Sequence, residues 1–422
     1  MSISNLKTAA SLTKRETTIS IGIIALLFFI FGFLSWINAI LIPYFKMAFS
    51  LTHFQSYLVA FAFYIAYFVM SVPSSYLLKS QGFKKGMMIG FIALALGTFI
   101  FIPAAITRTY EFFLIGLFTI GIGLAILQTA ANPYITILGP KERAAQRISI
   151  MGICNKFAGI IAPILFAAAV LRPGDGDVVD LDRVVIPYAV VSIAMLLIGI
   201  GVRYSPLPEL NTDEESEEMA ASNSTKTSVL QFPHLVLGAI AIFIHVGAQV
   251  ISIDTIIPYA QSMGLSLNEA KVFPSYTLAM AIIGYCFGIS VIPRFISQTN
   301  MLRAVTILGI VLSLLIVFVK GEVTILGHTT DISIWFIVLL GISNSLTWAG
   351  IWPLALDGLG RFTKVGASLL IMGLCGNALL PLVYGHFADT HSLREAYWVL
   401  VPCYLYLIYY AVYGHKIRKW SL

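Results

Sequence analysis

Residues 148–170 read ISIMGICNKFAGIIAPILFAAAV, an apolar stretch with one charged residue inside it, Lys156. About 20 apolar residues in a helix cross the roughly 30 Å hydrocarbon core of a bilayer, so this stretch is long enough to span a membrane. An ammonium group at that depth is costly and normally faces a bundle interior or a watery cavity, where it marks a substrate or ion path. We therefore expect Lys156 to face a functional cavity; a purely structural ion pair is the alternative.

The composition is that of a polytopic membrane protein. Hydrophobic residues make up 58% of the chain and charged residues 11%, with a mean hydropathy of +0.89, whereas soluble domains carry about 25% charged residues. The hydropathy pattern predicts an all-α membrane protein of twelve transmembrane helices. The predicted spans cover residues 19–45, 55–78, 86–106, 110–138, 148–171, 185–203, 232–262, 271–292, 304–320, 332–356, 365–388 and 395–414.

Loop charges predict that both termini lie in the cytoplasm. The first span is longer than a signal-peptide core, and Lys7, Lys14 and Arg15 precede it, which favours an N-terminus that stays inside. With this topology about 18 of the 26 Lys and Arg residues fall on the inner side, where anionic lipid attracts them. The net charge of +6 therefore indicates a lipid bilayer, and not nucleic acid, as the partner.

The sequence indicates no cofactor, metal site or enzyme chemistry. Cys154, Cys286, Cys375 and Cys403 fall within predicted spans and form no metal-ligand cluster. Neither a nucleotide-binding motif nor a convincing pair of nucleophile and base is present, so ATP-driven transport and catalysis are both disfavoured.

A long polar connection divides the chain. Residues 204–231 contain two prolines, an acidic run and a Ser/Thr-rich tail, which is the composition of a linker. We predict an N-terminal six-helix half at residues 1–203, a cytoplasmic linker at 204–231 and a C-terminal six-helix half at 232–422.

The two halves share a sequence pattern. Residues 128–139 read QTAANPYITILG, and a basic loop and the string IMGICN at 150–155 follow them. Residues 347–358 read TWAGIWPLALDG, and basic residues and IMGLCG at 371–376 follow them at almost equal spacing. Parallel repeats of this kind are typical of transporters that bind substrate near the midplane between two halves. We therefore expect alternating access, in which one half rocks against the other.

Polar residues are few within the predicted spans, and they fall at corresponding places in the two halves. Amides suit a neutral polyol, because each amide donates to and accepts from hydroxyl groups without a net charge to desolvate. Asn344, Trp348 and Trp352 share one helix face because they follow one another at intervals of four. The predicted substrate-binding residues are Asn38, Tyr64, Gln128, Asn132, Asn155, Lys156, His245, Gln249, Asn344, Trp348, Trp352 and Asn377.

Each of these residues has a structural alternative. Polar side chains in membrane bundles often only bridge helices, with bonds worth about 0.6 kcal/mol on average. The side chain of Asn132 could instead satisfy backbone groups that Pro133 leaves free. For ion coupling the candidates are Lys156 and Asp254, whereas Asp357 at the inner end of its span is interpreted as a gate or cap charge with a structural role.

The strings that contain these residues resemble the fucose/galactose/glucose:proton symporter family of the major facilitator superfamily, and within it the glucose/galactose-type bacterial members. The strings are FGFLSWINAILIPYFKMAF at 31–49, FAFYIAYF at 61–68, QTAANPYITILGP at 128–140 and HVGAQ at 245–249. The resemblance covers essentially all twelve predicted spans. It implies uptake of a monosaccharide across the bacterial inner membrane, coupled to a cation gradient.

Two departures from the family bear on coupling. Where the fucose permeases carry proton-coupling Asp and Glu, this chain has Ala39 and Gln128, which cannot titrate. Three mechanisms remain open. Lys156 could itself lose and regain a proton; its fixed charge could replace the ion and leave an uncoupled facilitator; or sodium could bind backbone carbonyls and amides such as those of Gln128 and Asn132.

The interpretation favoured by these residues is a sugar transporter for a neutral monosaccharide of the glucose, galactose or fucose type, expected to act as a monomer with proton or sodium as possible co-substrate. The alternatives within transport are an uncoupled facilitator, efflux of amphipathic compounds, and a carrier of sugar acids or N-acetylated sugars in which Lys156 pairs with a substrate carboxylate. A membrane-embedded enzyme or a non-transporting sugar sensor is a further hypothesis, disfavoured because no catalytic constellation or signalling domain accompanies the bundle.

Overall fold

The computed structural model describes residues 14–137, 144–170, 180–207, 227–292, 294–359 and 362–420. Helices make up the N-terminal half. They are α1 (Lys14–Trp36), α2 (Asn38–Ala48), α3 (His53–Ser56), α4 (Leu58–Gln81), α5 (Phe83–Thr107), α6 (Tyr110–Ile137), α7 (Ala144–Val170), the 3-10 turn η4 (Leu181–Val184) and α8 (Val185–Tyr204).

The C-terminal half repeats this helical pattern and adds a β-hairpin. Its helices are α10 (Pro233–Asp254), α11 (Ile256–Gln261), α12 (Leu267–Ala270), α13 (Phe273–Val291), α14 (Gln298–Phe318), α15 (Ser333–Leu356), α16 (Thr363–Met372), α17 (Gly376–Thr390) and α18 (Leu400–Val412). The 3-10 turns are η5 (Val229–Gln231), η7 (Gly373–Cys375), η8 (Glu395–Val399) and η9 (Gly414–Lys416). The strands β1 (Glu322–Ile325) and β2 (His328–Asp331) pair antiparallel.

The predicted all-α membrane bundle is confirmed. Within the described residues, 11 helical segments are long and apolar enough to cross a membrane, and the shorter apolar stretch Leu58–Ser74 of α4 completes the pattern. The hairpin β1–β2 between α14 and α15 was not predicted. Its turn places Leu326 and Gly327 at positive φ, +52° and +83°, which is the backbone that tight hairpin turns require.

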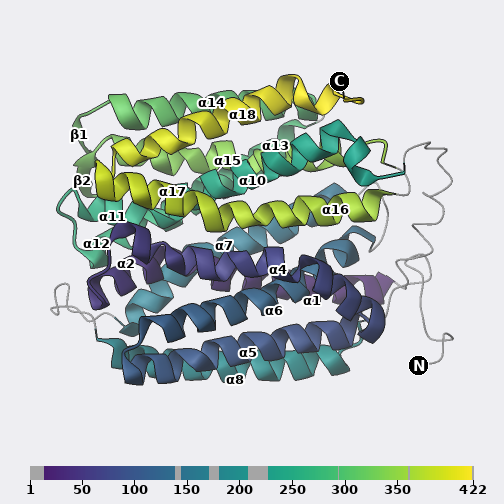
Figure 1. The fold of residues 1–422 in the computed structure, drawn as a ribbon, viewed down its shortest axis with the longest axis horizontal. Helices are drawn as coiled ribbons and strands as arrows, with labels where there is room; N and C mark the ends of the chain where they lie inside the picture. The colour runs from purple at the N-terminus through teal and green to yellow at the C-terminus, as the bar shows by residue number, and fades with distance from the viewer. Residues whose placement is uncertain are drawn as a thin grey trace.

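The two halves lie one above the other with their helices side by side (Figure 1). In that view the hairpin and helices α2, α11 and α12 lie at the left, and the C-terminus lies at the opposite side. We call the side with β1, β2, α3 and α12 the hairpin end, and the side with the start of α1 and with η9 the terminal end. Helices α4 and α17, and α7 and α13, pack against each other across the two halves.

Three predicted spans, two of them 19–45 and 232–262, contain a local break in the helix, although each forms one membrane span. Helix α1 ends at Trp36 and α2 begins at Asn38, whereas α10 ends at Asp254 and α11 begins at Ile256. A proline lies inside each second segment, Pro43 and Pro258. Proline lacks an N–H and its ring crowds the carbonyl four residues earlier, so it weakens the helix there. The predicted span 365–388 is likewise broken, by η7.

Close glycine contacts hold each broken span against its neighbour. A Cβ atom on Gly32 of α1 would overlap the backbone carbonyl of Asn155 in α7. In the other half a Cβ atom on Gly247 of α10 would lie 2.7 Å from the backbone carbonyl of Gly376. Asn155 and Gly376 follow the matching strings IMGIC and IMGLC, so the same contact recurs in both halves. Small residues allow membrane helices this close approach.

We predict that Gly32→Ala destabilises the bundle by about 1–3 kcal/mol, because α1 must move away from α7 to admit the methyl group. The measurement is the Tm of detergent-purified protein. Gly22→Ala on the same helix is the matched control, because a Cβ atom there meets no atom within 4 Å. Equal Tm values for the two variants would contradict the packing described here.

Candidate functional site between the two halves

The α1–α7 contact builds the first part of the site. Trp36 at the end of α1 donates its indole Nε1–H to Oδ1 of Asn155 at 3.0 Å, and Nδ2 of Asn155 donates to the carbonyl of Phe28 at 3.3 Å. Both polar atoms of the Asn155 side chain are therefore used within the N-terminal half. These bonds fix the plane of the Trp36 indole, and Lys156, the residue after Asn155, lies over that plane.

Lys156 is 5% exposed, and its Nζ lies 4.0 Å from the centre of the Trp36 ring, within the range of a cation–π contact. Helix α7 starts at Ala144, and its apolar membrane span runs from Ile150 to Val170, so Lys156 lies six residues, about 9 Å, into the span. Across the described part of the chain, no carboxylate forms an ion pair with Lys156. His245 of α10 lies within electrostatic range of this ammonium, and both of its ring nitrogens are buried without a hydrogen-bond partner.

Aligning the prolines of the repeats, Pro133 with Pro353, places Trp348 and Trp352 at the positions of Gln128 and Asn132. The two indoles stack with ring centres 5.2 Å apart and planes 25° from parallel. Gln128 donates its Nε2–H to the hydroxyl of Tyr67 at 2.8 Å. One half thus carries a hydrogen-bonding amide where the other carries an aromatic surface. Asn132 belongs to α6, but its side chain is outside the described residues.

Asn377 and Gln249 extend the C-terminal side. Asn377 of α17 follows IMGLCG and is the repeat equivalent of Lys156. It is 8% exposed, and its Oδ1 is buried without a hydrogen-bond partner. Gln249 is partly exposed on α10, one helical turn after His245. These side chains retain hydrogen-bonding capacity that a polar ligand could use.

Asn344, like Asn155, uses both of its side-chain polar atoms in bonds to other helices. Its Nδ2 donates to Ser252 at 3.2 Å, and its Oδ1 accepts from the hydroxyl of Tyr404 at 2.8 Å. The side chain is fully buried and connects α15 to α10 and to α18. In this conformation Asn344 therefore bridges helices, which is the structural alternative for such an amide.

A second group of buried polar atoms lies where α2 meets α10, and we call it the carboxyl cluster: Asn38, Tyr57, Tyr64 and Asp254. Both side-chain oxygens of Asp254, both polar atoms of Asn38 and the hydroxyl of Tyr57 are buried without a hydrogen-bond partner. The hydroxyl of Tyr64 lies beside the Asn38 amide, and Asp254 is within electrostatic range of both tyrosines.

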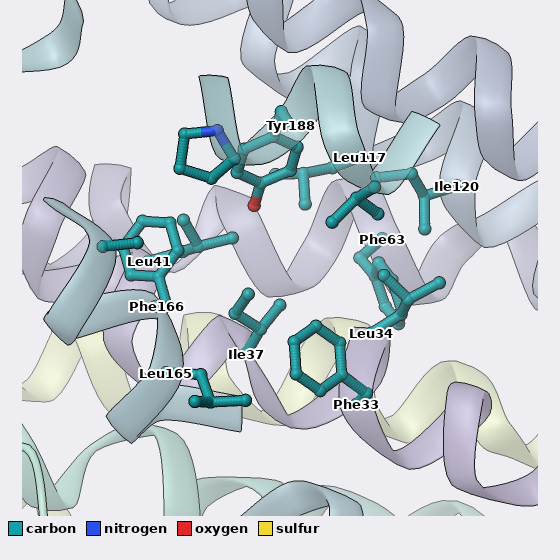
Figure 2. A pocket seen from close by; sticks show the side chains of 13 residues that line it. Phe33, Leu34, Ile37, Leu41, Phe63, Leu117, Ile120, Leu165, Phe166 and Tyr188 are labelled. Carbon is teal, nitrogen blue, oxygen red and sulfur yellow. The ribbon is translucent and has the colours of Figure 1, made fainter. Parts of the chain in front are cut away.

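An apolar cavity of about 170 Å³ lies inside the N-terminal half (Figure 2). Side chains such as Phe33, Leu41, Leu117 and Phe166 line it, and the hydroxyl of Tyr188 supplies an oxygen atom. A polyol would lose its water without gaining hydrogen bonds there, so this cavity does not suit a sugar.

The sequence model of the Major Facilitator Superfamily matches residues 24–381 of this chain. The chain belongs to the Major Facilitator Superfamily. Its resemblance at the sequence level and its all-α twelve-span fold agree with this membership.

Individual members of the superfamily match over nearly the full length. A glucose/galactose transporter of Brucella abortus is 35% identical over 398 residues, covering 93% of each chain. An L-fucose-proton symporter of Escherichia coli is 30% identical over 397 residues, covering 89% of this chain and 88% of the relative. In structure, the transporter FucP in the outward conformation aligns with a TM-score of 0.70 and 27% identity, covering 94% of this chain and 98% of FucP. These relatives are transporters by name and not enzymes.

In this superfamily member the two halves meet directly at the hairpin end. The backbone N–H groups of His53 and Phe54, at the start of α3, each donate to the carboxylate of Asp389 on α17 at 2.8 Å. Tyr57 and Tyr384 pack edge to face behind them, with ring centres 5.8 Å apart. Further bonds between the halves on this side run from Gln261 to the sulfur of Met47 and from Ser275 to the carbonyl of Ile160. The hairpin end is closed.

The imidazole of His53 stays uncharged in this contact. Burial and the neighbouring Lys46 ammonium lower the pKa of His53 to about 4. Nζ of Lys46 lies 2.7 Å from Nε2 of His53, so the ammonium donates to the neutral ring. Protonation of His53 therefore does not disturb the hairpin end between pH 5 and pH 8.

Sequence reasoning missed Tyr67 and Asp389. Tyr67 orients Gln128, but a tyrosine within an apolar span gives no signal by itself. Asp389 lies at the end of its span, where a carboxylate is ordinarily solvated, and its partners are backbone groups more than 300 residues away. No local pattern reports such a contact.

We predict that Asp389→Ala opens the hairpin end, because two charge-assisted hydrogen bonds between the halves are lost. A loss of about 1–2 kcal/mol would raise the open population about five- to thirtyfold. The measurement is the electron–electron distance between spin labels at Thr107 and His391, both exposed, in protein whose native cysteines are replaced. Asp357→Ala, at the terminal end and paired with Arg418, is the control. An unchanged distance distribution in Asp389→Ala would contradict the closing role of this carboxylate.

Proposed function

We propose that this chain takes up a neutral monosaccharide of the glucose, galactose or fucose type by alternating access. The printed names of its relatives, a glucose/galactose transporter and an L-fucose-proton symporter, support this substrate class. The predicted halves at 1–203 and 232–422 act as the two rocking units, and residues 204–231 join them. We further propose that the protein is a monomer in the bacterial inner membrane with both termini in the cytoplasm.

The observation that carries this proposal is the pairing of amide and aromatic groups across the halves. Gln128 lies on one repeat and the stacked indoles of Trp348 and Trp352 occupy the equivalent positions on the other. A sugar ring presents hydroxyls at its edge and C–H groups on its faces, so it suits an amide on one side and an indole on the other. His245, Gln249 and Asn377 add polar groups from the C-terminal side.

The closed hairpin end fits an alternating-access cycle. With the termini in the cytoplasm, the hairpin end faces outward, and its closure blocks exchange between the sugar site and the outside. In this proposal the site exchanges with the outside after Asp389 releases α3.

Transport is coupled to a cation, although Ala39 and Gln128 replace the family carboxylates. The relative named as an L-fucose-proton symporter favours the proton over sodium. In this proposal Lys156 acts mainly in the sugar site, where its ammonium donates to a hydroxyl and Trp36 holds it in place.

One observation favours a second candidate, the carriage of sugar acids or N-acetylated sugars. Lys156 has no carboxylate partner among the described residues, and a substrate carboxylate would provide one. A competition experiment distinguishes the two candidate substrate classes. If the second candidate is correct, glucuronate or N-acetylglucosamine displaces labelled substrate more strongly than glucose, galactose or fucose does.

We predict that purified protein in proteoliposomes exchanges labelled glucose, galactose or fucose by counterflow. Lys156→Ala is expected to raise the half-saturating sugar concentration about tenfold or more, because a charged hydrogen bond to the substrate is worth about 1.5–3 kcal/mol. Absence of counterflow for every neutral sugar in the wild type would contradict the proposed function.

The matched control for this substitution is Lys271→Ala. Lys271 lies at the hairpin end beside Asn268 and outside the proposed site. Its variant should keep the wild-type half-saturating concentration, and a tenfold rise in it would show that the Lys156 result reflects general damage.

A further inference from the structure

Asp254 has no carboxylate counterpart at the equivalent position of the first half. Residues 32–45 read GFLSWINAILIPYF and residues 247–260 read GAQVISIDTIIPYA. Aligning Gly32 with Gly247 and Pro43 with Pro258 places Asp254 opposite Ala39. The chain therefore carries a carboxylic acid in its second half at the position where its first half carries a methyl group.

The local backbone makes this position distinctive. Asp254 is the last residue of α10, and Pro258 stands four residues later, so the Asp254 carbonyl has no N–H partner at the usual helical place. Transporters commonly bind coupling ions where membrane helices are interrupted in this way. Thr255 at the break is held in place by a 2.7 Å hydrogen bond to the hydroxyl of Tyr397.

The surroundings of Asp254 offer no counter-charge. The side chain is 0% exposed, and neither oxygen has a hydrogen-bond partner. Among the described residues no Lys, Arg or His forms an ion pair with it. Helices α2, α11, α13, α15, α16, α17 and α18 pack against α10. Asp389 lies within electrostatic range of Tyr57, and the ion pair of Asp331 with Arg394 lies within range of Tyr259. The phenols that surround Asp254 stay uncharged at physiological pH. They are Tyr57, Tyr64, Tyr259, Tyr384, Tyr397 and Tyr404.

We propose that Asp254 is the proton-binding group of this transporter and that its protonation permits closure of the hairpin end. An isolated ionised carboxylate is far too costly to bury without a partner, so the closed interface accepts Asp254 only as the neutral acid. The proton binds one carboxylate oxygen when the hairpin end is open to water. No covalent bond changes, and one positive charge crosses with the sugar. This inference rests on the proposed sugar transport and identifies its coupling ion.

A line of polar groups connects Asp254 to the sugar site. Tyr64 lies within electrostatic range of Asp254 and stacks on Tyr67, with ring centres 6.2 Å apart. The hydroxyl of Tyr67 accepts from Gln128 at 2.8 Å. Release of sugar from Gln128 admits water along this line, the proton leaves to the terminal side, and the ionised Asp254 destabilises the closed hairpin end. The empty transporter then reopens outward.

The first test compares two activities of Asp254→Asn in proteoliposomes. The amide mimics the neutral acid, so counterflow of sugar should stay within about twofold of the wild type. Proton-driven uphill accumulation should vanish, leaving equal sugar concentrations inside and outside. Asp254→Glu keeps the carboxyl group and should retain part of the accumulation, and Asp357→Asn, paired with Arg418 at the terminal end, should retain all of it. Full accumulation by Asp254→Asn would overturn the inference.

The second test needs no transport. In wild-type protein the distance between spin labels at Thr107 and His391 should shift toward that of the open hairpin end as the pH rises. In Asp254→Asn this distance should not respond to pH. His53 does not contribute, because it is neutral throughout this range. If the wild type moves no sugar, the proposed function fails, but the pH response of the spin-label distance still tests the role of Asp254. The same pH response in the wild type and in Asp254→Asn would overturn that role.

Discussion

The contact between Gly32 and the backbone of Asn155 is the constraint on which the site depends. It brings α1 against α7 closely enough for Trp36 to bond Asn155 and to lie under the Lys156 ammonium. Gly247 and Gly376 make the equivalent contact in the other half, which sets Asn377 opposite Lys156 in the repeat. In lipid there is no hydrophobic force between helices, so such close packing has to hold the bundle together.

Duplication supplied one framework, and the two copies then diverged in chemistry. The N-terminal copy keeps the amide Gln128 and the ammonium Lys156, whereas the C-terminal copy has stacked indoles and Asp254. The proposed sugar site and the carboxyl cluster each take side chains from both halves. Rocking changes the distance between them, so sugar occupancy and protonation act on the same closing movement, as linkage between two sites requires.

The sequence predicted the helices well because twenty-residue apolar runs have few alternatives in a bilayer. Lys156 was found because one charge in an apolar span is conspicuous. The breaks at Ile37 and Thr255 were missed because hydropathy does not register where a proline weakens a helix. Asn344 was predicted to face substrate, yet its partners Ser252 and Tyr404 come from distant helices. Asp389 was missed for the same reason: its partners are backbone groups of the other half.

In the proposed mechanism sugar and a proton share one access cycle through this bundle. The pH of a weakly buffered suspension of proteoliposomes, recorded while a transported sugar is added outside without any imposed gradient, tests this mechanism. We expect sugar-dependent alkalinisation of the external medium in the wild type, because protons enter with the sugar. A constant external pH, in vesicles that exchange labelled sugar at the same time, would contradict it.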